Sequence, residues 1–463
     1  LKEHMAREED DTGEFELDRG PSPEPKTSLA EDSLHSLNQQ LLRVPEGFEV
    51  HRKLTPQFER RRTALGSEGG IDWAQAEELA LASLLSQGVP IRLTGQDSER
   101  GTFSQRHLVL HDAKTGEEHS RLMHLTKATA PFELHNSPLS ETGCLGFEYG
   151  YSAQAPEALV VWEAQFGDFV NAAQVIVDQF IASALAKWGQ TTRLTLLLPH
   201  GYEGSGPEHS SARLERFIQL SSEGNLRVAN PTTPAQYFHL LRRQALVSKQ
   251  RPLILMTPKS LLRHPQATSH VSELASGSFQ PVIDDPTLPA GRDQVTRLVL
   301  CSGKLYYDLI GHPGRADAHH LAVARVELLY PFAERELRDL MASYPSLETV
   351  VWAQEEPRNM GARAVMESRL LWLLADQGVH YEYVGRPLRA SPGEGYPPAH
   401  RAEQARILRE ALEVSAEAAG GGNGAPAAVG TSADRTSNGG GVGGPSDRTE
   451  GKTPATTAAE AGG

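Results

Sequence analysis

Cysteine is scarce in this 463-residue chain, and that scarcity excludes a fold held together by disulfides. Only Cys144 and Cys301 occur, and they lie far apart in the sequence. Small secreted scaffolds are rich in disulfides, so two isolated cysteines indicate a reducing compartment. We therefore expect both to be buried structural thiols, and we expect a cytoplasmic protein.

An excess of positive charge and long apolar runs are also missing. Lys and Arg number 45 against 59 for Asp and Glu, a formal net charge of −14. This balance argues against nucleic acid or a membrane surface as the main partner. No stretch approaches the roughly 18–20 uninterrupted apolar residues of a membrane-spanning helix, and Leu1 to His4 begin no apolar signal sequence. Because the first residue is Leu rather than Met, the chain is consistent with a piece of a longer polypeptide.

Three common ligand-binding motifs are absent from the sequence. There is no Walker loop, no dinucleotide-binding glycine fingerprint after a strand, and no Gly-Asp-Gly metal loop. The chain therefore lacks the familiar sequence signatures of a diphosphate site.

The length predicts two to three domains, at roughly 100–200 residues each. Changes in composition divide the chain into six segments: a disordered tail (1–30), a linker or helical lead-in (31–66), a first α/β domain (67–270), a connector (271–292), a smaller second α/β domain (293–415) and a disordered tail rich in Gly, Ala and Thr (416–463).

Apolar strands alternate with helical segments through both predicted domains. Strands are expected at 89–93, 159–162, 194–198, 226–228, 253–256, 297–301, 321–326 and 349–352. Helices are expected at 73–85 after the cap Asp72, from Ser140 and Glu141, at about 169–188, from Ser210 and Ser211, from Pro234 to about Val247, at 334–343 and at 363–374. Strands joined through helices indicate an α/β fold in which helices cover both faces of a parallel sheet.

Four loops that follow predicted strands are rich in polar, aromatic and glycine residues. Ligands of open parallel sheets bind at the carboxyl ends of the strands, so these loops should converge on one edge. They span 94–107, 163–169, 200–211 and 257–264.

Two histidines in these loops are candidates for acid–base or anion-binding roles. His200 and His209 flank three glycines and Pro207, a composition that lets the backbone approach a ligand closely. One of them could instead cap the helix expected at Ser210. A zinc site is the weaker interpretation, because the spacing is irregular and no cysteine is near.

An acidic residue and two aromatic residues have both an ordinary and a functional interpretation. Glu141 lies in a first helical turn, where a carboxylate usually stabilises the helix dipole. Phe166 and Phe169 could belong to the core, but their Gly-Asp loop favours a planar surface for stacking.

A locally basic set lies in the same loops of this acidic chain. It suits an anionic substrate or cofactor, with solvated surface charge as the alternative. The set comprises Arg100, Arg106, Lys259 and Arg263.

Several uninterrupted strings resemble a known family. TGQDSERGTFSQRH, LSETGCLGFEYGYS, WEAQFGDFVNAAQVIVDQF, HGYEGSGPEHSSARLER, RPLILMTPKSLLRHP and WAQEEPRNMGA resemble the C-terminal half of the thiamin-dependent first component of the 2-oxoglutarate dehydrogenase complex. The resemblance runs from about residue 67 to about 415. It implies a transketolase-like architecture, with a domain that binds the pyrimidine ring of thiamin diphosphate followed by a transketolase C-terminal domain.

The resemblance also implies roles for individual residues. Glu141 matches the glutamate that bonds the pyrimidine ring and drives formation of the cofactor's carbanion. Phe166, with Phe169 in the same segment, matches the aromatic position that stacks on the ring. His200 and His209 match active-site histidines. Residues of the loop after the first strand match the substrate-facing loop, namely Asp97, Arg100 and His107.

The implied activity is decarboxylation of 2-oxoglutarate and transfer of the succinyl group to lipoamide, in the tricarboxylic acid cycle. We also connect the chain with glycolysis. The family holds the diphosphate and Mg²⁺ in an N-terminal half that this sequence lacks, so the chain should carry only half of an active site. The implied partners are a second copy or a separate diphosphate-binding half, and a lipoyl-bearing dihydrolipoyl succinyltransferase. Alternatives are a 2-oxoadipate dehydrogenase and a non-catalytic dimerisation or regulatory module.

Overall fold

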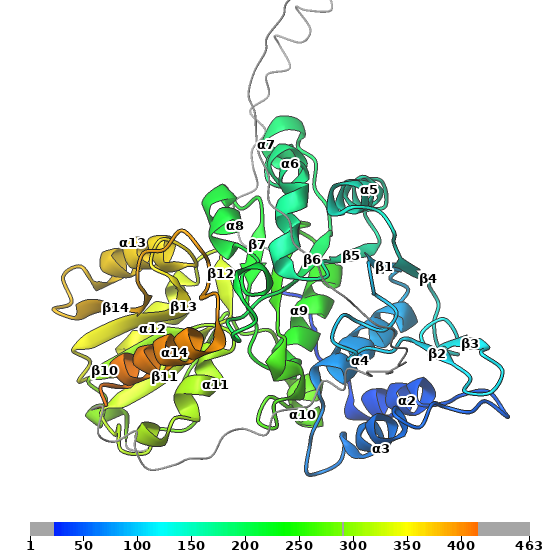
Figure 1. Cartoon of the computed structure of the whole chain (residues 1–463), viewed down its shortest axis with the longest axis horizontal. Coiled ribbons are helices and arrows are strands. Elements are labelled where there is room, and N and C mark those ends of the chain that lie inside the picture. Colours follow the sequence, from blue (N-terminus) through cyan, green and yellow to red (C-terminus); the bar gives the residue numbers. More distant parts are fainter. Residues whose placement is uncertain (1–22, 289–290, 415–463) are drawn as a thin grey trace, which may run out of the picture. The chain divides into compact units, whose positions relative to one another are not determined.

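Two β-sheets organise the computed structural model, which describes residues 23–288 and 291–414 (Figure 1). The seven-stranded sheet has the order β12-β7-β8-β6-β5-β1-β4, and the five-stranded sheet has the order β14-β13-β10-β11-β9. The strands of the first sheet are β1 (Ile91–Gly95), β4 (Phe132–Asn136), β5 (Leu159–Glu163), β6 (Thr195–Pro199), β7 (Arg227–Ala229), β8 (Leu253–Thr257) and β12 (Leu328–Tyr330). Those of the second are β9 (Val282–Ile283), β10 (Arg297–Cys301), β11 (Leu321–Val326), β13 (Thr349–Pro357) and β14 (His380–Arg386), and a separate hairpin joins β2 (Val109–His111) to β3 (Glu118–Ser120).

Both sheets are parallel except for one edge strand each. β12 pairs antiparallel with β7, and β9 pairs antiparallel with β11. β12 belongs to the second predicted domain but pairs with β7 at the edge of the first sheet. The two predicted domains are therefore linked by strand pairing as well as by the connector. The predicted α/β fold with parallel sheets is confirmed.

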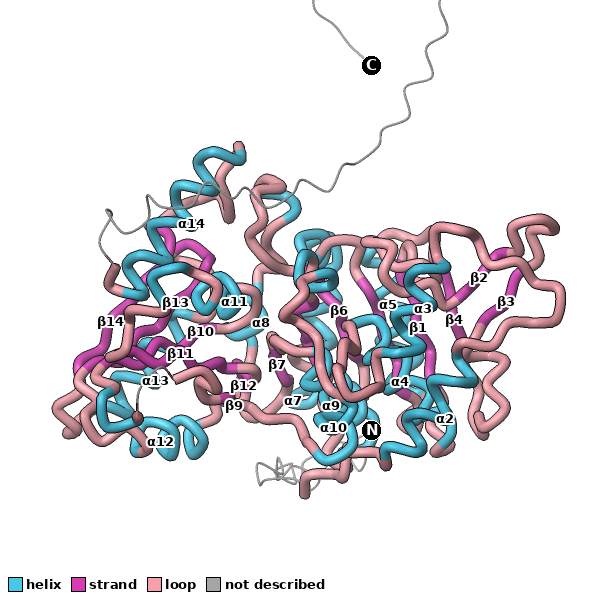
Figure 2. The backbone as a smooth tube through the Cα atoms, turned by 90° about the horizontal axis from the view of Figure 1, so that it is seen from below, coloured by secondary structure: helices cyan, strands magenta, loops and turns pink. Residues whose placement is uncertain are grey.

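Helices cover both faces of the sheets (Figure 2). They are α2 (Glu31–Leu41), α3 (Thr55–Thr63), α4 (Trp73–Ser86), α5 (Glu141–Gln154), α6 (Gln174–Ile176), α7 (Ala184–Trp188), α8 (Leu214–Leu220), α9 (Pro234–Leu246), α10 (Val271–Ser276), α11 (Leu305–Ile310), α12 (Glu334–Ala342), α13 (Arg363–Leu374) and α14 (Pro397–Leu412). Short 3₁₀ helices occupy Gly167–Ala173, Pro207–His209, Ser260–Arg263, Arg292–Gln294 and Pro313–Arg315, and a π-helix occupies Val177–Ile181.

The hydrophobic core is divided by sheet face rather than by predicted domain. Along β5, Leu159 and Val161 belong to one apolar cluster while Val160 and Trp162 belong to the other. Successive side chains of a strand point to opposite faces, so a sheet covered on both sides buries both sets. Each cluster continues from the first sheet into the second. The bounds of the two predicted domains stay a prediction.

Two predicted helices differ from the structure. The segment expected to be one helix at 169–188 changes from 3₁₀ to α to π to α geometry along its length. The helix expected from Ser210 begins at Leu214, because Arg213 has a left-handed backbone with φ of 55°. The backbone N–H groups of Ser210 and Ser211 donate to the Asp168 carboxylate instead of starting a helix.

The predicted N-terminal tail is partly packed against the first domain. Residues 1–22 and 415–463 lie outside the described residues, but 23–30 are extended and Thr27 is buried. The Thr27 hydroxyl lies 2.8 Å from Nδ1 of His239, and its carbonyl accepts from Nε of Arg242. Residues 23–30 are therefore not a free tail.

One helical stretch in the described part of the chain, Gly167–Trp188, is long and apolar enough to cross a membrane by length and composition. Its most apolar window is 33% buried. In the sequence, only uninterrupted apolar runs were considered as membrane spans. This stretch was not among them because Asp178 and Lys187 interrupt it. A single such helix is weak evidence for a span, because helices that cover a sheet pass the same test.

Candidate active site

Aromatic rings from three strand-end loops meet in one cluster, here called the aromatic cluster. Phe166 and Phe169 follow β5, His209 follows β6, and Phe103 follows β1. The Phe166 ring contacts His209 edge to face at 4.4 Å between centroids and lies 5.6 Å from the ring of Phe103. Phe169 lies 6.1 Å from His209. The carboxyl ends of neighbouring parallel strands thus bring together residues that are far apart in the sequence.

The fourth loop contributes a buried cation beside this cluster. Lys259 follows β8, is 6% exposed, and donates from Nζ to the carbonyl oxygen of His209. Burial lowers its pKa, against the attraction of Glu203 and Asp168. Among the described residues no carboxylate lies within ion-pair distance of Nζ. Within the described chain, the Lys259 ammonium group is therefore not paired with a carboxylate, and it faces the loop that carries His209.

His200 has no free ring nitrogen. Its Nδ1 accepts a hydrogen bond from the backbone N–H of Ala212 at 3.1 Å, and Nε2 lies 3.0 Å from Oε1 of Glu356. Nδ1 is therefore unprotonated in this arrangement, and Nε2–H donates to Glu356. Burial lowers the pKa of His200, but the hydrogen bond and the charge of Glu356 give a net rise. The structure places His200 as a buried support of the loop, while His209 lies in the aromatic cluster.

Two glutamates that sequence reasoning missed belong to this neighbourhood. Glu355 and Glu356 lie at the end of β13, and Glu355 pairs with Lys304 at 2.8 Å. With His200 and Lys259 they line a small cavity of about 20 Å³, large enough for one water molecule. Two adjacent glutamates at the end of an apolar strand, in WAQEEPR, were the available signal.

Asp168 and Gly167 fix the loops that carry the cluster. Asp168 is buried, and burial raises its pKa although its carboxylate accepts from the N–H groups of Ser210 and Ser211 at 3.3 and 3.0 Å. A Cβ atom on Gly167 would lie 2.6 Å from both the Pro199 oxygen and Cβ of Ala212, so only glycine fits there. The two loops are thereby held in close contact.

Glu141 lies at the first position of α5, close to the ends of β1 and β5. Ser140 caps the helix by accepting from the N–H of Gly143, and Oε1 of Glu141 accepts from Nε2 of Gln96 at 3.1 Å. Glu141 and Gln165, which precedes Phe166, line the same small cavity of about 10 Å³. The glutamate is half-buried, beside the segment that carries the aromatic cluster.

The loop after β1 divides its polar residues between different surroundings. Arg100 pairs with Asp97 within the loop and donates to Oγ of Ser104 at 2.6 Å. His107 has a left-handed backbone and donates from Nε2 to the Ser104 carbonyl, on the wall of a separate cavity. Among the described residues, no hydrogen bond or ion pair joins the side chains of Asp97, Arg100 or His107 to the aromatic cluster.

The two remaining members of the basic set take structural positions. Arg106 is buried between Glu77 and Glu163, with N–O distances of 2.5 and 2.6 Å. Arg263 donates from Nη2 to the carbonyl oxygen of Phe103 at 2.5 Å. Cys144 and Cys301 are free and buried, as expected.

Comparisons with known proteins assign two successive regions of the chain. Residues 69–265 match the family model described as transketolase, pyrimidine binding domain. Residues 268–412 match the model described as 2-oxoglutarate dehydrogenase C-terminal. These two matches follow one another along nearly all of the described chain.

Curated relatives carry one shared name, 2-oxoglutarate dehydrogenase E1 component. The protein from Geobacillus kaustophilus is 56% identical over 394 residues, which cover 84% of this chain and 41% of the relative. That from Bacillus subtilis is 52% identical over 395 residues, covering 84% and 42%. That from Bacillus velezensis is 51% identical over 419 residues, covering 89% and 44%.

The chain therefore spans about two fifths of the length of the curated relatives it matches. Their shared name does not support the expected connection with glycolysis, which is withdrawn. The order of the two matched regions agrees with the resemblance seen in the strand-end strings. Through residues 69–412, this chain belongs to the transketolase-like family of 2-oxoglutarate dehydrogenase E1 components.

Proposed function

We propose that this chain forms the pyrimidine-binding half of a thiamin-dependent active site. Joined to a diphosphate-binding half, it decarboxylates 2-oxoglutarate and passes the succinyl group to a lipoyl arm of dihydrolipoyl succinyltransferase. The observation that carries the proposal is the meeting of Phe166, Phe169 and His209 at the strand ends, with Glu141 at the neighbouring end of α5.

The residues present fit the aminopyrimidine ring of thiamin diphosphate. In the described structure only Oε1 of Glu141 has a hydrogen-bond partner, Gln96, so Oε2 remains available for a ring nitrogen. Phe166 and Phe169 supply aromatic surface for a planar ring. When bound, thiamin diphosphate supplies a carbanion that attacks the keto carbon of a 2-oxo acid.

The residues present do not provide for the diphosphate and its metal. Among the described residues there is no group of three or more His, Cys, Asp or Glu side chains able to hold a metal ion. Mg²⁺ needs several oxygen ligands in near-octahedral geometry. We therefore place the Mg²⁺ and diphosphate ligands on a diphosphate-binding half outside this sequence, carried by a longer polypeptide or by a separate chain.

The substrate is recognised through its charge. 2-Oxoglutarate carries two carboxylates, and Lys259 holds a buried positive charge against His209. His209 is half-buried in the aromatic cluster and can exchange a proton there, while His200 positions its loop. Asp97, Arg100 and His107 keep supporting roles in the loop after β1.

Free, buried Cys144 and Cys301 support the cytoplasmic location that we also propose.

The experiment titrates thiamin diphosphate and Mg²⁺ into this chain, alone and mixed with a separately produced diphosphate-binding half. Release of CO₂ from 2-oxoglutarate is expected in the mixture only. Glu141→Gln should lower the rate about 10²–10⁴-fold, the range for removing an acid–base group. Glu157→Gln, an exposed position just beyond α5, is the matched control and should leave the rate unchanged.

Two outcomes would overturn the proposal. One is a folded mixture that decarboxylates no 2-oxo acid, together with unchanged cofactor binding by Glu141→Gln; this would favour the non-catalytic alternative. The other is retained activity after alanine replaces Glu141, Phe166, His200 and His209. Rates on 2-oxoglutarate and 2-oxoadipate measured side by side separate the two substrates, because one methylene usually changes discrimination by about 1–3 kcal/mol.

A further inference from the structure

A cavity of about 630 Å³ lies behind the loop that follows β1. Its walls come from the turn before α3 and α3 itself, from the β2–β3 hairpin, from the start of α4 and from the 3₁₀ helix after β8. None of the aromatic-cluster residues lines it. Cavities that bind small molecules usually measure about 300–1,000 Å³, so this one has the size of a ligand site.

Three cations from different segments face this cavity without an acidic partner. Lys53, Arg60 and Arg263 line it, and none forms an ion pair with a carboxylate in the described part of the chain. They lie before α3, within α3 and after β8 respectively. Acidic residues outnumber basic ones in this chain, whose net charge is −14. Three basic side chains without acidic partners around one cavity are therefore unusual.

The two carboxylates in the lining are already engaged by the backbone. Asp72 accepts from the N–H of Gln75 at 2.8 Å as the cap of α4. Asp112 accepts from the N–H groups of Glu49, Thr115 and Lys114, at 2.6, 2.7 and 2.8 Å, and these bonds lower its pKa to about 2. In the described part of the chain, neither carboxylate lies within ion-pair distance of the three cations.

The rest of the lining combines polar side chains, among them His51, His107 and His111, with an apolar wall. Leu54, Val109, Leu110 and Leu262 border the same space as the cations. A guanidinium group matches phosphate oxygens with two parallel N–H bonds, and an apolar wall accepts the remainder of an organic molecule. We propose that this cavity binds an organic phosphate with an apolar body.

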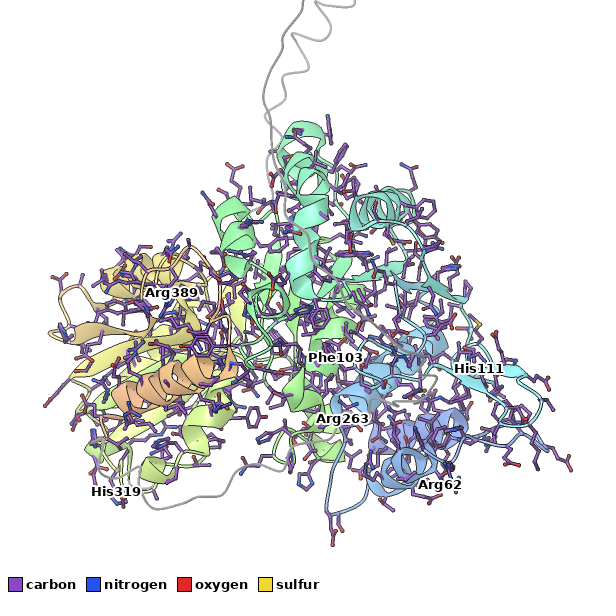
Figure 3. All side chains as sticks on the ribbon, viewed as in Figure 1. Arg62, Phe103, His111, Arg263, His319 and Arg389 are labelled. Carbon is purple, nitrogen blue, oxygen red and sulfur yellow. The ribbon has the colours of Figure 1, made fainter. Side chains whose placement is uncertain are left out.

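A ligand there would act on the loop that reaches the aromatic cluster. Arg263 lies near Phe103 (Figure 3) and donates to its carbonyl oxygen. The Phe103 ring lies against Phe166. The same loop contains left-handed residues at Gly101, Ser104 and His107. A phosphate that draws Arg263 away releases Phe103, so occupancy of the cavity changes the freedom of this loop.

The test compares flavin mononucleotide with riboflavin, which differ only by the phosphate. Each is titrated into the full chain by calorimetry, and amide hydrogen exchange locates the bound probe. One equivalent of flavin mononucleotide is expected to bind at least about tenfold more tightly than riboflavin. Exchange should change in residues 51–60 and 104–113, which form the walls, and in 96–103.

Variants separate the cavity from other surfaces. Arg60→Gln and Arg263→Gln are each expected to weaken binding of flavin mononucleotide by about tenfold. Arg62→Gln is the matched control, because Arg62 lies on the same helix, is 58% exposed and pairs with Glu59. Equal binding of the two flavins, no binding up to about 1 mM, or exchange changes confined to other segments would each overturn the proposal.

Discussion

The two ring nitrogens of His200 decide what this residue can do. Its position in a glycine-rich loop after β6 suggested an acid–base role, yet Ala212 N–H and Glu356 occupy both nitrogens. His209, in the same loop, keeps its ring against Phe166. A sequence shows that two histidines share a loop, but a contact from β13, over 150 positions further along the chain, gives the two rings different surroundings.

Replacing Glu356 tests the buried support of His200. Glu356→Leu leaves Nε2–H of His200 without an acceptor, so the free energy of unfolding should fall by about 1–3 kcal/mol. Glu356→Gln keeps an acceptor oxygen and should lose clearly less. Urea denaturation measures both. The exposed pair of Glu31 and His35, at 3.8 Å, provides the control, because Glu31→Gln should change stability by less than about 0.5 kcal/mol. Equal losses in the two Glu356 variants would contradict this role.

At the level of elements, the strands with continuous apolar runs were predictable and the irregular segments were not. β1, β5, β6, β8, β10 and β11 appear where apolar runs predicted them, and Asp72 caps α4 as expected. β12 was missed because an antiparallel edge strand of three residues has no distinctive pattern. The broken helix at 167–188 looked continuous because periodicity does not distinguish 3₁₀, α and π turns.

The candidate site, too, was only partly predictable from the sequence. The four strand-end loops were found from composition, and three of them do converge on the aromatic cluster. Phe103 was within a loop of interest but was not singled out, because its importance depends on a neighbour from another strand. Glu355 and Glu356 belong to the second sheet, so their approach to His200 depends on tertiary packing.

Arg106 joins three elements and gives the sharpest prediction at this scale. It is 2% exposed and binds Glu77 of α4 and Glu163 at the end of β5, and Tyr237 of α9 donates to Glu77. Burial lowers the pKa of Arg106, but the two carboxylates raise it well above its ordinary value. Arg106→Met leaves two buried carboxylates without their cation and should lower the free energy of unfolding by about 3–5 kcal/mol.

The control for Arg106 lies six residues earlier in the same loop. Arg100 pairs with Asp97 at a site where Arg100 is 50% exposed, so Arg100→Met should lower the free energy of unfolding by less than about 1 kcal/mol. Urea denaturation curves of Arg106→Met and Arg100→Met measure the two losses of stability. Similar stability of the two variants would show that the buried network contributes no more than a surface pair.

For the whole molecule, the two core clusters continue from one sheet into the other, so the sheets should unfold together. β12 adds a physical link, because it belongs to the second matched region and pairs with β7 of the first sheet. Of the ten exposed large apolar residues in the described part of the chain, five lie on α5, just before it or within Gly167–Trp188, beside the proposed cofactor site. Phe147 of α5 is 56% exposed, and Val175 of α6 is 55% exposed.

A second copy seated on these elements would bury them and lie next to Glu141 and Phe166. We therefore expect the chain to form a dimer in sedimentation experiments.

Two substitutions test where the copies meet. Phe147→Glu and Val175→Glu, made singly, should each raise the dissociation constant of the dimer by at least about tenfold, because a charge would be buried in the contact. Leu388→Glu is the control, because Leu388 is 70% exposed in the second matched region, between β14 and α14. If both variants remain dimeric, or if only Leu388→Glu dissociates, the contact between copies lies elsewhere. If the unmodified chain is monomeric and associates only with a separate diphosphate-binding half, that half covers this face instead.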